Sequence, residues 1–249
     1  MAVKSADRVL DIFEHLTGFP EGLTVKELSD HMNWAPSSTI GLLKTLSDRE
    51  YLSVDAKKRY SLGPKLINLG MATVSMLDIC KVAEPILKEI LNKLGETVFL
   101  AVRSSSEIVY IAKQNSTRTI STNANVGMRK PLYCTGLGKA FLAFMDRESS
   151  EKLMDTIDYK VFTKNTVSSK EILKQQLEEF RKQGYAVDNG EIEEELWCVA
   201  VPIYDANHQV IAAMSCAGPK TRMLPKNDIV AQTMKQASQT ISRKYGYIK

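Results

Sequence analysis

The sequence predicts an α+β protein in which an N-terminal winged helix-turn-helix domain is joined by a helical linker to a C-terminal α+β domain with a largely antiparallel sheet. Two amphipathic segments and a β-rich pair follow one another between Thr24 and Leu62. Strand-like and helix-like segments then interleave as far as a long hairpin near the C-terminus, a pattern typical of α+β domains. The expected boundaries are 1–63 for the first domain, 64–79 for the linker and 80–249 for the second domain.

The first helix of the helix-turn-helix pair is expected to begin at Thr24. Thr24 is a good N-cap, and Glu27 follows at the spacing of a capping box. Val25, Leu28 and Met32 then recur at helical spacing and form one apolar face. A preceding helix, capped by Ser5, is expected to pack behind the pair through Val9, Leu10, Ile12, Phe13 and Leu16.

A second helix is expected to open at Pro36, because the N–H that proline lacks is unpaired in a first helical turn. Ile40, Leu43 and Leu46 follow at i, i+3 and i+6, which predicts that these three side chains are buried. The opposite side of this helix begins with short hydroxyl side chains at a helix N-terminus, where free N–H groups favour a phosphate. These residues are Ser37, Ser38 and Thr39.

The next segments predict a β-hairpin, the wing, in which Tyr51–Val54 and Arg59–Leu62 flank a short polar turn. In a winged helix-turn-helix, the second helix enters the major groove and the wing lies along the backbone. The alternative is a small helical hairpin with a solvated run of charges. Arg8 in the preceding helix either reaches a phosphate or is simply solvated. The candidate DNA contacts are Arg8, Thr24, Pro36, Ser37, Ser38, Thr39, Gly41, Lys44, Lys57, Lys58 and Arg59.

Composition bounds these predictions. The 249 residues carry a net charge of only +4, so DNA binding depends on local charge placement and not on bulk charge. Four cysteines (Cys80, Cys134, Cys198 and Cys216) form no CxxC pair, which favours a reducing cytosol. The sequence has no apolar run of membrane-spanning length and no signal-peptide core, so we expect a cytoplasmic protein without membrane contact.

The linker and the second domain contain further helices. Leu66, Leu69, Val74 and Leu77 recur too regularly for a flexible tether, so we expect a rigid helical connector. In the second domain, residues 117–126 are expected to be extended and residues 127–131 to form a loop.

Three pieces of the second domain are candidates for a ligand pocket. Residues 135–139 precede a helix, and their glycines let an anion approach the free N–H groups. The phosphate-loop motif GxxxxGK[ST] is absent, so we expect no nucleoside triphosphate site. Asp188 ends a predicted strand, and Cys198 and Ser215 lie on the two strands of the long hairpin. Each piece taken alone is also explained by core packing and turn glycines.

Taken together, the chain resembles the IclR family of bacterial transcription regulators. The resemblance is carried by residues 35–46, 59–70, 94–102, 131–140, 184–188, 198–205 and 212–219. It implies a repressor that binds a palindromic operator in double-stranded DNA as a homodimer, with pairing of dimers into a tetramer as a further state. It also implies that the second domain is a GAF/PAS-like α/β effector-binding domain. The effector is a small molecule, commonly a carboxylate, and the resemblance implies neither a cofactor nor a metal.

The resemblance implies a set of effector-binding residues. The backbone amides of Gly136 and Leu137 and the hydroxyl of Ser215 suit a carboxylate, and Asp188 suits a ligand hydroxyl. Lys130 stands where an aliphatic residue is common, so the ligand remains open. The full set is Lys130, Gly136, Leu137, Asp188, Leu196, Cys198, Ser215 and Ala217, the last standing where relatives often have a second serine. Two residues of the DNA-reading domain depart from what the resemblance leads us to expect. Gly41 stands where a cation or His is expected, and Glu50 stands where Gly is expected.

Two alternatives remain at this stage. The first is a metal- or thiol-responsive regulator that uses the cysteines. The second is an enzyme that uses the C-terminal pocket, although His15, His31 and His208 include no evident partner for a cysteine nucleophile.

Overall fold

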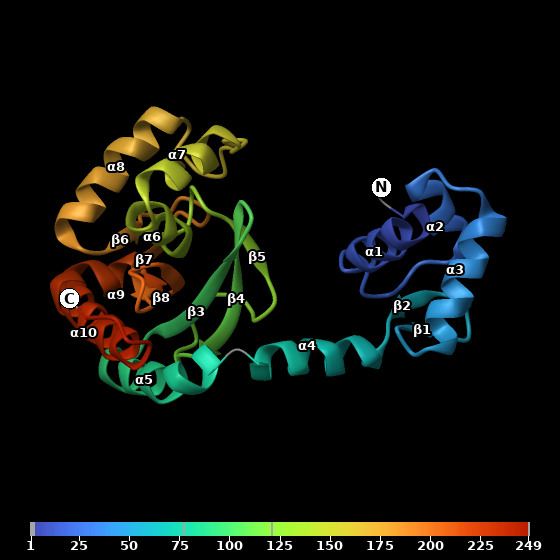
Figure 1. The fold of residues 1–249 in the computed structure, drawn as a ribbon, viewed down its shortest axis with the longest axis horizontal. Coiled ribbons are helices and arrows are strands. Elements are labelled where there is room, and N and C mark those ends of the chain that lie inside the picture. The colour runs from blue at the N-terminus through green and yellow to red at the C-terminus, as the bar shows by residue number, and fades with distance from the viewer. Residues whose placement is uncertain (1–2, 77, 121, 249) are drawn as a thin grey trace. The chain divides into compact units, whose positions relative to one another are not determined.

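The structure, a computed structural model, describes residues 3–76, 78–120 and 122–248 (Figure 1). The chain divides into two compact units, Met1–Met76 and Leu77–Lys249. Each unit has its own hydrophobic core, and each is described separately below. Leu77, which we expected in the linker helix, lies outside the described residues.

The first unit is a winged helix-turn-helix, as predicted. Its core contains Ile12, Leu16, Leu23, Leu28, Leu43, Leu46 and Leu52. The predicted capping box is confirmed, because the Thr24 hydroxyl accepts from the Glu27 N–H and the Glu27 carboxylate accepts from the Thr24 N–H. The elements are α1 (Lys4–Leu16), α2 (Val25–Met32), α3 (Pro36–Asp48), β1 (Leu52–Val54), β2 (Tyr60–Leu62) and α4 (Pro64–Met76).

Three details of this unit differ from the sequence predictions. Helix α1 has Val3 at its N-cap without a side-chain cap, so the prediction of Ser5 as the cap is wrong. Leu10 and Ile40 are 58% and 52% exposed, although both were assigned to buried faces. The buried side of α3 contains Thr39, Leu43 and Leu46, so the prediction is confirmed for Leu43 and Leu46, and Thr39 takes the place expected for Ile40. Thr39 tolerates burial because its hydroxyl donates to the Ala35 carbonyl at 3.2 Å.

The second unit is built around one six-stranded sheet in the order β5-β4-β3-β8-β7-β6. Every described strand pairing in it is antiparallel, which confirms the predicted sheet. The strands are β3 (Thr97–Ser104), β4 (Glu107–Gln114), β5 (Arg129–Pro131), β6 (Ala186–Asp188), β7 (Leu196–Tyr204) and β8 (Val210–Pro219). The helices are α5 (Asp78–Leu94), α6 (Gly136–Phe144), α7 (Arg147–Asp155), α8 (Lys170–Gln183), α9 (Lys220–Met223) and α10 (Asn227–Lys244), with a 3-10 turn at Leu224–Lys226.

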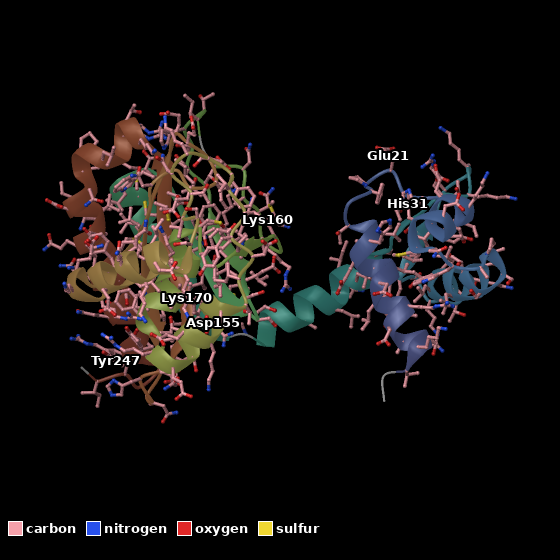
Figure 2. All side chains as sticks on the ribbon, turned by 90° about the horizontal axis from the view of Figure 1, so that it is seen from above. Glu21, His31, Asp155, Lys160, Lys170 and Tyr247 are labelled. Atoms are coloured by element: carbon pink, nitrogen blue, oxygen red, sulfur yellow. The ribbon has the colours of Figure 1, made fainter. Side chains whose placement is uncertain are left out.

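Helices cover both faces of this sheet (Figure 1). Alternate residues of the central strands enter different cores, since successive strand side chains point to opposite faces. Phe99 packs with α6 and α8, whereas Val98 packs with α5 and α10. On the surface, Lys170 lies beside its ion-pair partner Asp155 (Figure 2).

The segment between β4 and α6 also differs from the predictions. Residues 129–131 form the edge strand β5, whereas a loop was expected there. Residues 117–126 were expected to be extended, but they form no strand in their described part, which omits residue 121. This segment is held by side-chain contacts, described below, that sequence periodicity does not report.

Candidate functional site

The exposed side of α3 is the candidate DNA-reading surface. Ser37, Gly41 and Lys44 are exposed on it. The Ser38 hydroxyl donates to the Ala35 carbonyl at 2.9 Å and accepts from Arg8 at 3.3 Å. The Arg8 guanidinium also lies 4.8 Å from the centre of the Trp34 ring, so this side chain is held against the start of α3 and is not simply solvated.

Thr39 cannot serve as the predicted DNA contact, because its side chain is fully buried. Pro36 is exposed at the first turn, and the Thr24 hydroxyl is engaged by the capping box. Ile40, which was predicted to be buried, is exposed on the same helix. Of the three hydroxyl residues at the start of α3, only Ser37 and Ser38 therefore remain as candidate DNA contacts.

The wing carries two solvent-exposed cations. Lys57 and Lys58 are exposed at its tip, where the Asp55 carboxylate accepts from the N–H groups of residues 57 and 59 at 2.9 and 2.8 Å. Arg59 instead pairs with Glu27 at 3.2 Å and donates to the Gly22 carbonyl at 2.8 Å. The Arg59 side chain therefore holds the wing against the start of α2, and its role as a DNA contact stays a prediction.

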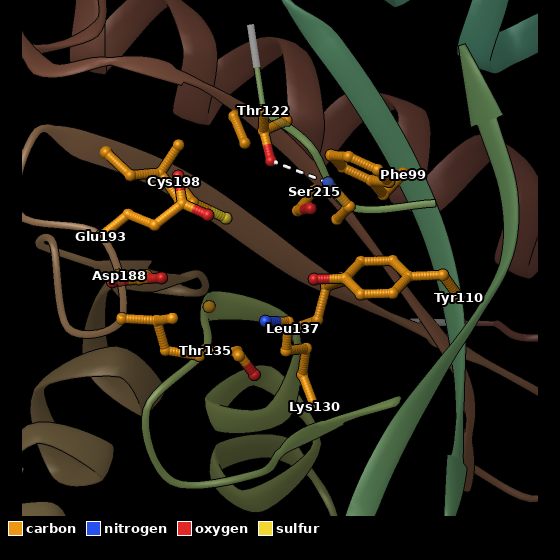
Figure 3. Close-up of a pocket in the computed structure, with 15 residues that line it drawn as sticks. Phe99, Tyr110, Thr122, Lys130, Thr135, Leu137, Asp188, Glu193, Cys198 and Ser215 are labelled. Atoms are coloured by element: carbon orange, nitrogen blue, oxygen red, sulfur yellow. Dashed lines mark hydrogen bonds between the residues drawn. The ribbon is translucent and has the colours of Figure 1, made fainter. Parts of the chain in front are cut away.

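All eight predicted effector residues line one cavity in the second unit (Figure 3). Strand register explains part of this convergence. Asp188 pairs with Cys198, and Cys198 pairs with Ala217, so these residues form a row across β6, β7 and β8. Ser215 lies in the next row on the same face. The space free of protein atoms among these residues is about 470 Å³, and this figure includes solvent at the open mouth of the cavity.

The N-terminus of α6 closes one wall of the cavity. The Thr135 hydroxyl caps this helix by accepting from the Gly138 N–H at 3.0 Å. A Cβ on Gly136 would lie 2.7 Å from the Cys198 sulfur, so the glycine lets the helix start approach strand β7. The first N–H groups of a helix lack intrahelical partners, and with the helix dipole they form a site for an anion.

Buried ionisable groups surround this wall. Asp188 is 3% exposed, and burial raises the pKa of its carboxyl to about 7, while the neighbouring Lys139 opposes this shift. Its Oδ1 accepts from the Glu191 N–H at 2.9 Å. Glu191 and Lys139 form an ion pair in which each side chain is only 1% exposed. At neutral pH the Asp188 carboxyl therefore exists in both protonation states and offers a ligand an acceptor or a donor.

Thr135, from the predicted segment 135–139, also lines the cavity. Six further lining residues were missed: Phe99, Tyr110, Thr122, Ala124, Ile192 and Glu193. Figure 3 shows Tyr110 and Lys130 on one side of the cavity and Asp188 and Glu193 on the other. The rings of Phe99 and Tyr110 lie 5.0 Å apart, centre to centre. Strand alternation in the sequence could have placed these two on the pocket face, but nothing local marks Thr122 or Glu193.

The loop that contributes Thr122 and Ala124 is tied to the sheet by a buried carboxylate. Glu96 is fully buried and accepts two 2.7 Å bonds from the Arg222 guanidinium. Arg222 also donates to the Ile120 carbonyl at 2.9 Å, just before the lining residues. The two partners are separated by 126 residues, so no sequence pattern revealed this link.

The cysteines do not form a reactive centre. Burial is the main cause that raises the pKa of the Cys134 and Cys216 thiols, each to about 12, and burial also raises the pKa of the Cys198 thiol. Such thiols stay protonated, which argues against a thiol-responsive site. Within residues 3–76, 78–120 and 122–248, no group of three His, Cys, Asp or Glu side chains is placed to hold a metal ion.

None of the helices in those ranges is both long and apolar enough to cross a bilayer.

Comparisons with known proteins agree with this architecture. The profile of the IclR helix-turn-helix domain matches residues 5–56, and the profile of the bacterial transcriptional regulator IclR C-terminal domain matches residues 71–243. The chain is 32% identical over 249 residues to the HTH-type transcriptional regulator KdgR of Escherichia coli, covering 99% of this chain and 94% of that protein. It is 29% identical over 247 residues to the HTH-type transcriptional repressor AllR of Salmonella typhimurium, covering 97% and 91%.

A solved structure supports the same assignment. The crystal structure of the Thermotoga maritima IclR superposes with a TM-score of 0.79 at 31% identity, covering 98% of this chain and 99% of that one. These relatives are transcription regulators, so the enzyme alternative is excluded. The chain belongs to the IclR family of bacterial transcriptional regulators, which bind DNA through a helix-turn-helix domain and a small-molecule effector through the C-terminal domain.

Proposed function

We propose that the effector is a small hydroxylated carboxylic acid. The observation that carries this proposal is the convergence of the α6 N-terminus, Lys130 and Asp188 on one cavity. The helix start and the Lys130 ammonium both favour an anionic group. Asp188, Glu193 and the Tyr110 hydroxyl on the remaining walls suit ligand hydroxyls. The eight predicted effector residues are proposed as the core of this site.

We propose that the protein is a repressor that acts as a homodimer on a palindromic operator, with a tetramer as a further assembly. Two reading units related by a two-fold axis match a palindrome. Leu10 on α1 and Ile67 on α4 are 58% and 67% exposed, which suits a surface covered by a second copy. The repressor assignment is supported by the name of the relative AllR.

The proposed mechanism is linkage between the two sites. The effector binds one arrangement of the second unit more tightly, and the helical segment between the units passes that preference to the paired reading units. A coupling of about 1–3 kcal/mol changes operator affinity roughly 5- to 150-fold. An acid that binds and leaves operator affinity unchanged would contradict the coupling.

The effector proposal is tested with a panel of hydroxy acids, their deoxy analogues and aromatic acids, titrated by calorimetry. Lys130→Met is expected to weaken every acid, because it removes a cation near the anionic group. Asp188→Asn is expected to weaken hydroxy acids more than deoxy analogues. Equal losses for both ligand classes in Asp188→Asn, or unchanged affinity in Lys130→Met, would contradict the assignment.

A further inference from the structure

The DNA-reading face of α3 carries one large apolar side chain. Ile40 is 52% exposed, while its neighbours Thr39 and Leu43 are fully buried. A single exposed isoleucine is ordinary on a protein surface. This one is unusual in its position, because it shares the exposed side of the helix with Ser37 and Lys44.

Gly41 lies directly beside Ile40 in the helix. A Cβ added at Gly41 would meet no atom within 4 Å, and its φ is not in the left-handed region, so the fold of the chain does not require glycine there. Among residues other than proline, glycine is the least favourable in a helix interior. The exposed side of α3 therefore presents an apolar projection next to a point where the helix backbone is bare.

We infer that Ile40 reads a thymine methyl group in the major groove, and that Gly41 lets the α3 backbone come close enough for this contact. The thymine methyl is the apolar feature that distinguishes base pairs on the major-groove edge, and apolar side chains recognise it. Ser37 and Lys44 supply hydrogen bonds to phosphates or base edges on either side. The inference rests on DNA binding through α3 and adds a base preference to it.

The test begins with an operator recovered by the full-length protein from random duplexes. Each thymine of that operator is then replaced by deoxyuridine, which removes only the methyl group. In each half-site, one thymine position is expected to be sensitive. Replacing that one thymine removes one buried methyl and should weaken wild-type binding about fourfold. Ile40→Ala is expected to bind the thymine and uracil operators equally well.

Two variants serve as controls. Val3→Ala trims another exposed apolar side chain of the same unit and is expected to keep the sensitivity to uracil. Ser37→Ala shares the reading face and is also expected to keep it. Because Ile40 is half exposed, Ile40→Ala should fold, which the fluorescence of Trp34 checks.

Each remaining outcome is decisive. Wild-type protein that tolerates every uracil, or Ile40→Ala that keeps the full sensitivity, would overturn the methyl contact while leaving the DNA-binding function intact. Failure to retain any duplex would instead overturn the use of α3 for DNA binding, and this inference with it.

Discussion

The two units differ in where their charged side chains lie. Among the described residues of the first unit, the buried polar side chains are Ser29 and Thr39, and no charged side chain is buried. In its described part, the second unit buries four charged side chains: Glu96, Lys139, Asp188 and Glu191. Exposed cations suit DNA, because the gain comes from releasing counterions. Buried charges suit recognition of one small molecule, because an unmatched ligand group leaves them unpaired.

The largest effect is expected from breaking the ion pair between the fully buried Glu96 carboxylate and the partly buried Arg222 guanidinium. Arg222→Ala leaves the Glu96 carboxylate buried, with Lys226 at 3.7 Å and Arg118 at 3.8 Å as its remaining cationic neighbours among the described residues. Loss of one partner of a buried pair costs about 3–5 kcal/mol in the free energy of unfolding. The chain has two tryptophans, one in each unit, so the fluorescence of Trp197 in a Trp34→Phe background reports urea unfolding of this unit alone.

The matched control is an exposed pair in the same unit. The Arg147 and Glu178 side chains are 72% and 37% exposed, so Arg147→Ala should cost at most about 1 kcal/mol. Equal losses in Arg222→Ala and Arg147→Ala would remove the contrast between buried and exposed charge in this unit.

The next effect concerns Asp188 and pH. Because burial raises its pKa to about 7, the folded unit binds a proton more tightly than the unfolded chain does. The destabilising effect of the ionised carboxyl therefore grows as the pH rises from about 4 to 7, and it levels off above that. Asp188→Asn removes this term, so its stability relative to wild type should increase by about 1–3 kcal/mol between pH 5 and 7.

Urea unfolding of both proteins at several pH values, followed by Trp197, measures this difference. The pKa of Glu191 is also raised by burial, and its charge interacts with Asp188, so the measured difference includes the response of Glu191 to the substitution. A gap between the two proteins that does not change with pH would place the ionisation of Asp188 outside this range.

The same contrast explains which features the sequence could reveal. Local signals predicted the capping box at Thr24, the hairpin of the wing and the order of strands and helices. The eight effector residues came from the family resemblance, and all of them line the cavity. Thr39 was predicted to contact DNA because it carries a hydroxyl. Its position in the helix instead turns the side chain into the core. A run of adjacent cations gave no hint that Arg59 pairs with Glu27, because that contact depends on tertiary structure.

Glu50, one of the two unexpected residues of the first unit, adopts an unusual backbone conformation. Glu50 stands where glycine was expected, and its φ of 62° lies in the left-handed region. Non-glycine residues reach this region at a cost of about 1–2 kcal/mol. The tie between Glu96 and Arg222, by contrast, left no trace in local sequence, since it joins the residue before β3 to α9, 126 residues later in the chain.

A smaller effect is expected at the wing. The double variant Lys57→Ala, Lys58→Ala should reduce the slope of log affinity against log salt by about 1–2, since each phosphate neutralised contributes about 0.9. Binding to all sequences should weaken by a similar factor. Arg59→Ala is the comparison, and a slope change as large as that of the double variant would show that Arg59 leaves Glu27 to contact DNA.

The smallest effect compares two glycines of the first unit. Gly41 in α3 and Gly70 in α4 both lie in helices, and a Cβ on either would meet no atom within 4 Å. Each glycine-to-alanine substitution should therefore raise the free energy of unfolding by up to about 1 kcal/mol, measured by Trp34 fluorescence in a Trp197→Phe background. Only Gly41→Ala should also lower operator affinity, because its methyl would stand between the α3 backbone and the base pairs. If both variants gain stability and bind the operator as wild type does, α3 does not approach DNA closely at Gly41, and the reading surface would have to be centred on Ser37 and Lys44 alone.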